Sequence, residues 1–409
     1  MIKTPKGLRL HIGIFGRRNV GKSSLLNALT RQTVSIVSDI AGTTTDPVEK
    51  PMELLPIGPV VFIDTAGIDD VGILGELRTT RTKKIFDRTD LAIIVSTGDG
   101  WSTFEEDLLK EFKERSVPII IVFNKVDLES PSDELIQKLN NKKHAVVQTI
   151  ATEASGIFDL HEAIIRQTPQ DIINSPAIIS DLIQTGDMAI LVVPIDKEAP
   201  KGRLILPQVQ TIRDILDSDA YCMVVKESEL RDAFQRLNSK PAIVVTDSQA
   251  FLKVAADTPN DILMTSFSIL FARVKGNLSE FVRGAMVIDK LKPGDSVLIA
   301  ESCSHHPITD DIGTVKIPRW LTQFVGGKIN FSHSHGHDFP EDLKKYKLII
   351  HCGSCMFNRR EMLSRIMYAR RAGVPITNYG LTIAYSLGIF ERALSPFPGV
   401  LEMYRELKK

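Results

Sequence analysis

The chain has 409 residues, in which 50 lysines and arginines are balanced by 50 aspartates and glutamates. A net charge of zero provides no long-range field toward phosphate backbones or anionic lipid, so we predict neither nucleic acid nor membrane as a partner. The length exceeds that of one typical domain, and a hydrophobic content of 43% supports well-buried cores, so two or three domains are expected.

Signals of export or membrane insertion are missing from the sequence. No apolar run approaches the roughly 18 residues that span a bilayer, and the opening MIKTPKGLRLHIGIFG enters a strand pattern without a signal-peptide cleavage site. We therefore expect a cytoplasmic protein. Four cysteines in a long cytosolic chain do not suit a disulfide framework, which favours metal binding or redox chemistry where they cluster.

Residues 1–168 have the pattern of an α/β domain with a parallel sheet. The apolar runs LHIGIF, VVFIDT, LAIIVS and IIIVFN alternate with helix-like stretches, as in βαβ units. Between the first run and the helix-like SSLLNALTR lies GRRNVGKS, which fits the P-loop pattern in the context that this pattern requires. The segment RQTPQDIINSP, at 166–176, is predicted to be a linker.

The P-loop predicts a site for nucleotide phosphates. Its glycines allow backbone N–H groups to surround the phosphates, Lys22 can reach the β and γ oxygens, and Ser23 can ligate Mg²⁺. The predicted phosphate contacts are Gly16, Arg17, Arg18, Asn19, Val20, Gly21, Lys22, Ser23 and Ser24.

Two further motifs follow strand-like runs and predict GTP as the nucleotide. In DTAG, Asp64 can hold Mg²⁺ while the Gly67 N–H meets the γ-phosphate. In NKVD, comprising Asn124, Lys125 and Asp127, the aspartate can accept two hydrogen bonds from guanine, a donor pair that adenine lacks.

Two weaker elements complete the predicted nucleotide site. The stretch GTTTD, at 42–46, is typical of a switch segment, in which Thr44 is the residue that we expect to close over Mg²⁺; its neighbours Thr43 and Thr45 remain alternatives. In IATEASGI, Ala151 aligns with a backbone contact to the guanine oxygen, although Ile150 occupies the place of the usual serine.

These motifs resemble the GTPases of the TrmE-Era branch over about 160 residues. Ile68 follows Gly67 where many small GTPases carry a glutamine that orients water, so we expect slow unaided hydrolysis of GTP to GDP. The resemblance also implies that Asn19 helps to bind K⁺ near the phosphates, although an asparagine there can simply be a turn former. Faster hydrolysis in K⁺ than in Na⁺ at equal ionic strength is the expected result.

Residues 176–266 show a second alternation of short strands and helices without a phosphate loop. We predict a small parallel α/β module that forms a homodimer. Cys222, flanked by apolar residues in YCMVVK, is predicted to be a core thiol. In residues 268–409 we expect one long helix over SILFARVKGNLSEFVRGAMVIDKL, strands at SVLIAE and YKLIIHC, and a helix over NRREMLSRIMYARRAG.

Both clusters of cysteine and histidine begin where one of these strands ends, which is the edge of an α/β sheet where ligands bind. Cys303 and His305 form the first cluster, and His351, Cys352 and Cys355 form the second. Three thiolates suit a [4Fe–4S] cluster with one iron left for another ligand, and they equally suit Cys₃His zinc.

A GTPase of this branch followed by an α/β module and C-x-H…H-C-x-x-C resembles the HydF family of [FeFe]-hydrogenase maturation GTPases, over essentially the whole chain. The resemblance implies a domain at 268–409 that binds a [4Fe–4S] cluster through Cys303, Cys352 and Cys355. It also implies a scaffold that carries a di-iron precursor to apo-[FeFe]-hydrogenase, with radical S-adenosylmethionine maturases as further partners. His305 and His351 are then candidate ligands or hydrogen-bond partners of the cluster.

Some assignments stay open at this point. The fourth iron position has Glu301, Asp310 and Asp311 as further candidates. The histidines of SHSHGHD, at 333, 335 and 337, are expected in a solvated turn, with a second metal site as the alternative. A GTPase with a structural zinc module acting on RNA or ribosomes, and a redox GTPase that passes electrons, are the rival functions.

Overall fold

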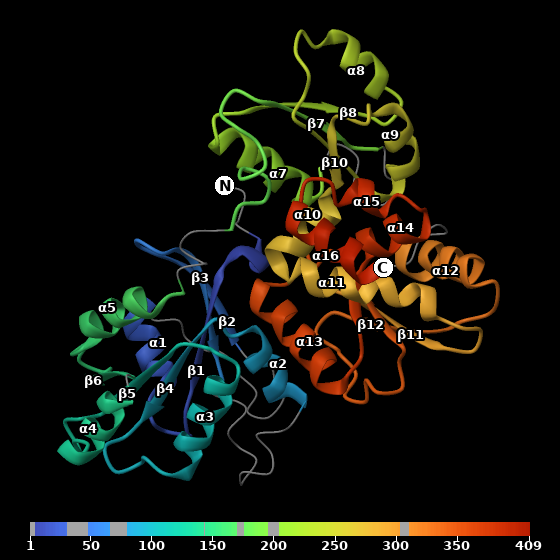
Figure 1. Ribbon diagram of the computed structural model, residues 1–409. Coiled ribbons are helices and arrows are strands. Elements are labelled where there is room, and N and C mark those ends of the chain that lie inside the picture. Colours follow the sequence, from blue (N-terminus) through green and yellow to red (C-terminus); the bar gives the residue numbers. More distant parts are fainter. Residues whose placement is uncertain are drawn as a thin grey trace, which may run out of the picture. The chain divides into compact units, whose positions relative to one another are not determined.

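A computed structural model describes residues 5–30, 48–65, 80–142, 144–169, 176–194, 204–302 and 311–409. The chain divides into two compact units, Met1–Ser175 and Pro176–Lys409. Within the described residues, no helix is both long enough and apolar enough to cross a membrane. Figure 1 shows the elements of each unit.

The first unit is built on a six-stranded sheet in the order β2-β3-β1-β4-β5-β6. All neighbouring strands are parallel except β2 and β3, which are antiparallel. Strands β1, β4 and β5 are buried along their whole length, as expected for apolar runs covered by helices on both faces. Its elements are η1 (Lys6–Leu8), β1 (Leu10–Phe15), α1 (Lys22–Thr30), β2 (Val48–Leu54), β3 (Gly58–Asp64), α2 (Thr80–Arg88), β4 (Leu91–Ser96), α3 (Thr103–Glu114), β5 (Ile119–Asn124), α4 (Asp133–Asn141), β6 (Ala145–Thr149) and α5 (Ile157–Gln167).

The second unit contains two parallel sheets of four strands, in the orders β10-β9-β7-β8 and β12-β11-β13-β14. The α/β class predicted from the alternating pattern is therefore confirmed. The elements around the first sheet are β7 (Met188–Val192), α7 (Leu206–Asp217), β8 (Tyr221–Val225), α8 (Leu230–Arg236), β9 (Ile243–Thr246), η2 (Ser248–Ala250), α9 (Phe251–Asp257), β10 (Leu263–Ser266) and α10 (Phe267–Lys275).

The second sheet and the C-terminal helices belong to the same unit. Their elements are α11 (Leu278–Ala285), η3 (Met286–Lys290), β11 (Ser296–Glu301), η4 (Ile312–Lys316), α12 (Ile317–Val325), β12 (Asn330–His335), β13 (Leu348–His351), α13 (Arg359–Ala372), β14 (Ile376–Asn378), α14 (Tyr379–Ser386), α15 (Phe390–Ala393) and α16 (Pro398–Lys408).

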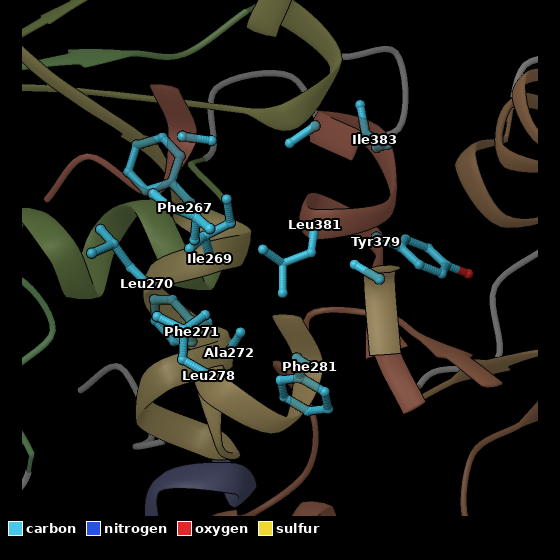
Figure 2. Close-up of a cluster of buried hydrophobic side chains, with 14 of the residues drawn as sticks. Phe267, Ile269, Leu270, Phe271, Ala272, Leu278, Phe281, Tyr379, Leu381 and Ile383 are labelled. Carbon is cyan, nitrogen blue, oxygen red and sulfur yellow. The ribbon is translucent and has the colours of Figure 1, made fainter. Parts of the chain in front are cut away.

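One continuous hydrophobic core joins the two sheets of the second unit. Figure 2 shows Leu381 of α14 among side chains of α10 and α11, with the Tyr379 hydroxyl directed away from this apolar cluster. Because the core includes residues on both sides of position 276, the two sheets pack as parts of one unit.

The single long helix predicted from residue 268 is wrong, because the structure divides it into α10, α11 and η3. Gly276 ends α10 with φ −130° and ψ −137°, and a Cβ there would lie 2.5 Å from the Phe281 ring. Asn277 then starts α11 by accepting a hydrogen bond from the Glu280 N–H at 3.0 Å. The apolar period continues across the break, which is why the sequence pattern resembles one helix.

Two smaller expectations also need correction. Cys222 packs against the hydrophobic core, as predicted, but is only partly buried, because it lies on β8, an edge strand with an exposed side. The segment SHSHGHD is not simply a solvated turn: His333 and His335 lie on strand β12, which pairs with β11. His337 follows that strand and is held by Glu361 at 2.9 Å.

Candidate functional site

The P-loop connects the end of β1 to the start of α1 and has the backbone shape of a phosphate cradle. Gly16, Asn19 and Gly21 have φ values of +145°, +64° and +94°. A Cβ at Gly16 would lie 2.2 Å from the Val95 carbonyl oxygen, so only glycine fits there. The Lys22 ammonium folds over the loop and donates to the carbonyls of Gly16 at 2.5 Å and Arg17 at 2.8 Å.

The candidate magnesium ligands from two different motifs meet in the folded chain. Ser23, on the first turn of α1, donates to the Asp64 carboxylate at 3.0 Å, and Asp64 is the last residue of β3. A hydroxyl and a carboxylate at this spacing are oxygen ligands that Mg²⁺ accepts. Thr44 and Gly67 lie outside the described residues.

Asn124 joins the P-loop to the predicted guanine site. Its amide nitrogen donates to the Val20 carbonyl at 2.9 Å, while its amide oxygen accepts from the Thr149 hydroxyl and the Ala151 N–H, each at 3.0 Å. The side chain is therefore committed to holding two loops together. Asp127 lies exposed beyond the end of β5.

Arg17 of the P-loop is held by the start of α3, a contact that the motif does not predict. Its Nε donates to Glu105 at 3.2 Å, Nη2 donates to the Ser102 hydroxyl, and the guanidinium lies over the Phe104 ring. Glu105 is fully buried and also completes a capping box with Ser102. Hydrogen bonds from Arg17 therefore connect the P-loop to the start of α3.

The second candidate site is a pair of thiols after β13. Strand β13 is adjacent to β11, with Ala300 opposite His351. The Cys352 sulfur receives the backbone N–H of Ser302 at 3.1 Å and that of Ser354 at 3.5 Å. Backbone donors aimed at sulfur stabilise a thiolate.

Cys355 follows Cys352 after two intervening residues. Burial raises the pKa of both thiols, while hydrogen bonds from Ser302 and Ser354 act to lower the pKa of Cys352. The nearby Lys275 ammonium acts to lower the pKa of Cys355. Two partly buried thiols beside hydrogen-bond donors and a cation suit a metal that binds them as thiolates.

His351 is fully buried, and both of its ring nitrogens have partners. Nε2 lies 2.9 Å from Nη1 of Arg365, a group that can only donate, so Nε2 accepts and Nδ1 carries the hydrogen. Nδ1 donates to the Cys352 carbonyl at 3.0 Å, with the Ser354 hydroxyl at 3.1 Å. Burial lowers the pKa of His351 to about 3, and the Arg365 charge acts in the same direction, so the ring is neutral.

Glu301, at the end of β11, is held on two sides. The buried Tyr379 donates to its carboxylate at 2.8 Å, and His335 Nδ1 lies 3.1 Å from the other oxygen. Asp311, another candidate ligand, is buried and caps the next helical turn by accepting from the Thr314 N–H at 2.7 Å. Cys303, His305 and Asp310 lie outside the described residues.

The described residues contribute two thiols of the kind that hold an iron–sulfur group. In the part of the chain that the structure describes, no group of three or more histidine, cysteine, aspartate or glutamate side chains is arranged around a metal position. Cys352 and Cys355 provide two adjacent thiols, and Ser302, which touches the Cys352 sulfur, immediately precedes Cys303. Thiols are the soft ligands that such a cluster requires.

Family models match three consecutive parts of the chain. Residues 11–125 match the 50S ribosome-binding GTPase, residues 178–276 the hydrogen maturase F dimerization domain, and residues 279–396 the hydrogen maturase F tetramerization domain. The two hydrogen maturase F models together cover more than half of the 409 residues. The chain belongs to the hydrogen maturase F family. The predicted family and the predicted GTPase domain are both confirmed.

Curated relatives match part of the chain. The tRNA modification GTPase MnmE of Prochlorococcus marinus (strain NATL1A) is 38% identical over 161 residues, which is 39% of this chain and 34% of that protein. MnmE of Nostoc sp. is 32% identical over 245 residues, 58% of this chain and 49% of that protein. The chain thus spans a third to a half of the length of these relatives. A solved structure of Aquifex aeolicus Era bound to GDP and AlF₄⁻ has 21% identity and a TM-score of 0.33, covering 60% of this chain and 97% of Era.

Sequence reasoning missed several residues that shape these sites, namely Glu105, Arg365, Glu361 and Tyr379. One signal was present for two of them: Glu361 and Arg365 are four residues apart on a helix whose buried face also carries Met362. A charged pair on the apolar face of a helix must find partners inside the protein. Further along the same helix, Arg370 is exposed.

Proposed function

We propose that the chain is a GTP-hydrolysing scaffold that holds a [4Fe–4S] cluster and carries the precursor of the di-iron subcluster during [FeFe]-hydrogenase maturation. Membership of the hydrogen maturase F family supports the biological process. Apo-[FeFe]-hydrogenase and radical S-adenosylmethionine maturases are the proposed partners, and the dimerization and tetramerization domains support self-association as a homodimer or larger assembly.

The contact between Ser302 and the Cys352 sulfur carries the cluster proposal. It brings the ends of β11 and β13 together at 3.1 Å, and Cys303 is the residue that follows Ser302 in the sequence. When bound, a cluster with three thiolate ligands offers one iron for a replaceable ligand, which a carrier needs. The chain's own part is to provide the thiolates and the N–H groups that hydrogen-bond to them.

GTP binding is proposed at the P-loop, with phosphoryl transfer to water. Lys22 would move from the carbonyls of Gly16 and Arg17 to the phosphates, while Ser23 and Asp64 would hold Mg²⁺. Asp127 would select guanine, and the positive φ of Asn19 would present its side chain or carbonyl to K⁺.

Cysteine-to-serine variants test the cluster. The protein is purified anaerobically, its iron and zinc contents are measured, and an EPR spectrum is recorded after reduction. We expect about four irons per chain and loss of the brown chromophore in Cys303→Ser, Cys352→Ser or Cys355→Ser. Cys222→Ser is the matched control, because this partly buried thiol lies on the other sheet. A colourless protein with stoichiometric zinc would instead support the zinc-module alternative.

A further inference from the structure

Arg365 is a buried cation that belongs neither to the nucleotide site nor to the proposed set of metal ligands. Its side chain is 3% exposed and lies between the rings of Phe339, at 4.8 Å, and Phe357, at 4.4 Å. Its Nη2 donates to the Gly336 carbonyl at 2.6 Å and lies 3.6 Å from Glu361. These contacts fix the guanidinium, so the remaining Nη1 has a defined direction.

Nη1 of Arg365 is directed at His351 and determines what this histidine does. The 2.9 Å contact makes Nε2 an acceptor, so the hydrogen on Nδ1 is available to the Cys352 carbonyl and the Ser354 hydroxyl. Ser354 is itself 2% exposed and has a φ of +55°, a conformation that a non-glycine residue adopts only when its surroundings hold it. The chain of contacts therefore runs from Arg365 through His351 to the turn between the two cysteines.

We propose that Arg365 is a positioning residue for Cys352 and Cys355, acting through His351 to hold the C-x-x-C turn in its binding shape before any metal arrives. The inference rests on the proposed thiolate site, and it assigns His351 to bracing the turn rather than to ligating iron. Both nitrogens of the ring are already occupied, so ligation would require the contact to Arg365 to break. Loss of a group that orients a metal ligand typically costs 10- to 100-fold in metal affinity.

The test uses the full chain with Cys222→Ser, which leaves Cys303, Cys352 and Cys355 as the remaining cysteines. Arg365→Lys keeps the positive charge beside Glu361 but lacks the planar fork that reaches His351 and Gly336 together. Arg370→Lys is the matched control, since Arg370 is on the same helix and its side chain is 65% exposed. His351→Gln and the double variant Arg365→Lys/His351→Gln complete a cycle.

Two measurements are made on metal-free protein. One is the rate at which iodoacetamide alkylates each cysteine, followed by mass spectrometry. The other is the dissociation constant for Co²⁺ alone, from the thiolate-to-cobalt charge-transfer absorption. We expect Arg365→Lys to alkylate at Cys352 and Cys355 about 10-fold faster and to bind Co²⁺ about 10-fold more weakly. Arg370→Lys should match the parent.

If Arg365 acts through His351, the effects of the two substitutions on alkylation rate and Co²⁺ affinity should not add. The double variant should then have the same rate and affinity as His351→Gln. Unchanged alkylation and Co²⁺ binding in Arg365→Lys would overturn the proposal, as would fully additive effects in the double variant. Loss of Co²⁺ binding altogether in His351→Gln, with thiol protection retained, would make His351 a ligand. If the parent protein itself binds no Co²⁺ through thiolates, the proposed metal site fails, while the alkylation rates still test the positioning role.

Discussion

Asn124 and His351 are buried polar residues whose side chains hold loops in place at the two candidate sites. Each makes hydrogen bonds through both of its polar ends: Asn124 to the P-loop and to the segment at the end of β6, and His351 to α13 and to the turn that follows it. A buried polar group that loses its partner retains the cost of desolvation without the compensating bond. Substitution at either position should therefore affect more than the group that is removed.

Replacing Asn124 with alanine tests this reasoning at the nucleotide site. The Val20 carbonyl, the Thr149 hydroxyl and the Ala151 N–H would each lose their bond to this side chain. At about 1–3 kcal/mol for a buried group left unpaired, we expect the free energy of unfolding to fall by about 2–4 kcal/mol. Urea unfolding and titration with a fluorescent GTP analogue measure the stability and the accompanying loss of affinity.

The control for that variant is Asn140→Ala, because Asn140 is exposed on α4. A surface substitution of this kind should change the free energy of unfolding by no more than about 0.5 kcal/mol. Equal stability of Asn124→Ala and the parent would mean that water replaces the side chain without cost.

At the scale of elements, packing of helix α11 against strand β14 requires a glycine. A Cβ at Gly284 would lie 2.0 Å from the Ile376 carbonyl oxygen, which is backbone and cannot move aside cheaply. Gly284→Ala should lower the free energy of unfolding by about 1–3 kcal/mol despite the higher helix propensity of alanine. Gly399→Ala, on α16 with no atom near the added Cβ, should raise it by about 0.4–1 kcal/mol in the same urea experiment.

The edge strand β8 leads to a second prediction at this scale. Tyr221 and Val224 are 61% and 42% exposed on a strand that has one neighbouring strand among the described residues, within the matched dimerization domain. Unpaired edges with apolar side chains favour association with another chain. Val224→Lys should weaken self-association at least 10-fold in sedimentation experiments, whereas Leu252→Lys, at an exposed position on α9, should not. If Leu252→Lys weakened self-association and Val224→Lys did not, the interface would lie at α9 instead.

For the whole molecule, the separation of the hydrophobic cores predicts independent folding of the two units. Core residues of the first unit lie between positions 10 and 164, and those of the second lie between 178 and 404. A fragment of residues 176–409 should therefore unfold in one cooperative transition by circular dichroism, within a few degrees of the matching transition in the full chain. A fragment with helical far-ultraviolet signal but no cooperative transition would show that its core depends on the first unit.

Sequence patterns were sufficient to predict the α/β class, the GTPase domain and the family, because alternating apolar runs and motifs such as the P-loop and C-x-x-C are each formed by residues that are near one another in the chain. The break between α10 and α11 at Gly276 could not be predicted from the apolar period, because it depends on how closely the Phe281 ring packs against Gly276. Tertiary structure likewise decided that Asn124 joins two loops and that Arg365 reaches His351. Such contacts join residues that are 14 to 104 positions apart, and the partner of a buried polar group is determined by packing that no local pattern records.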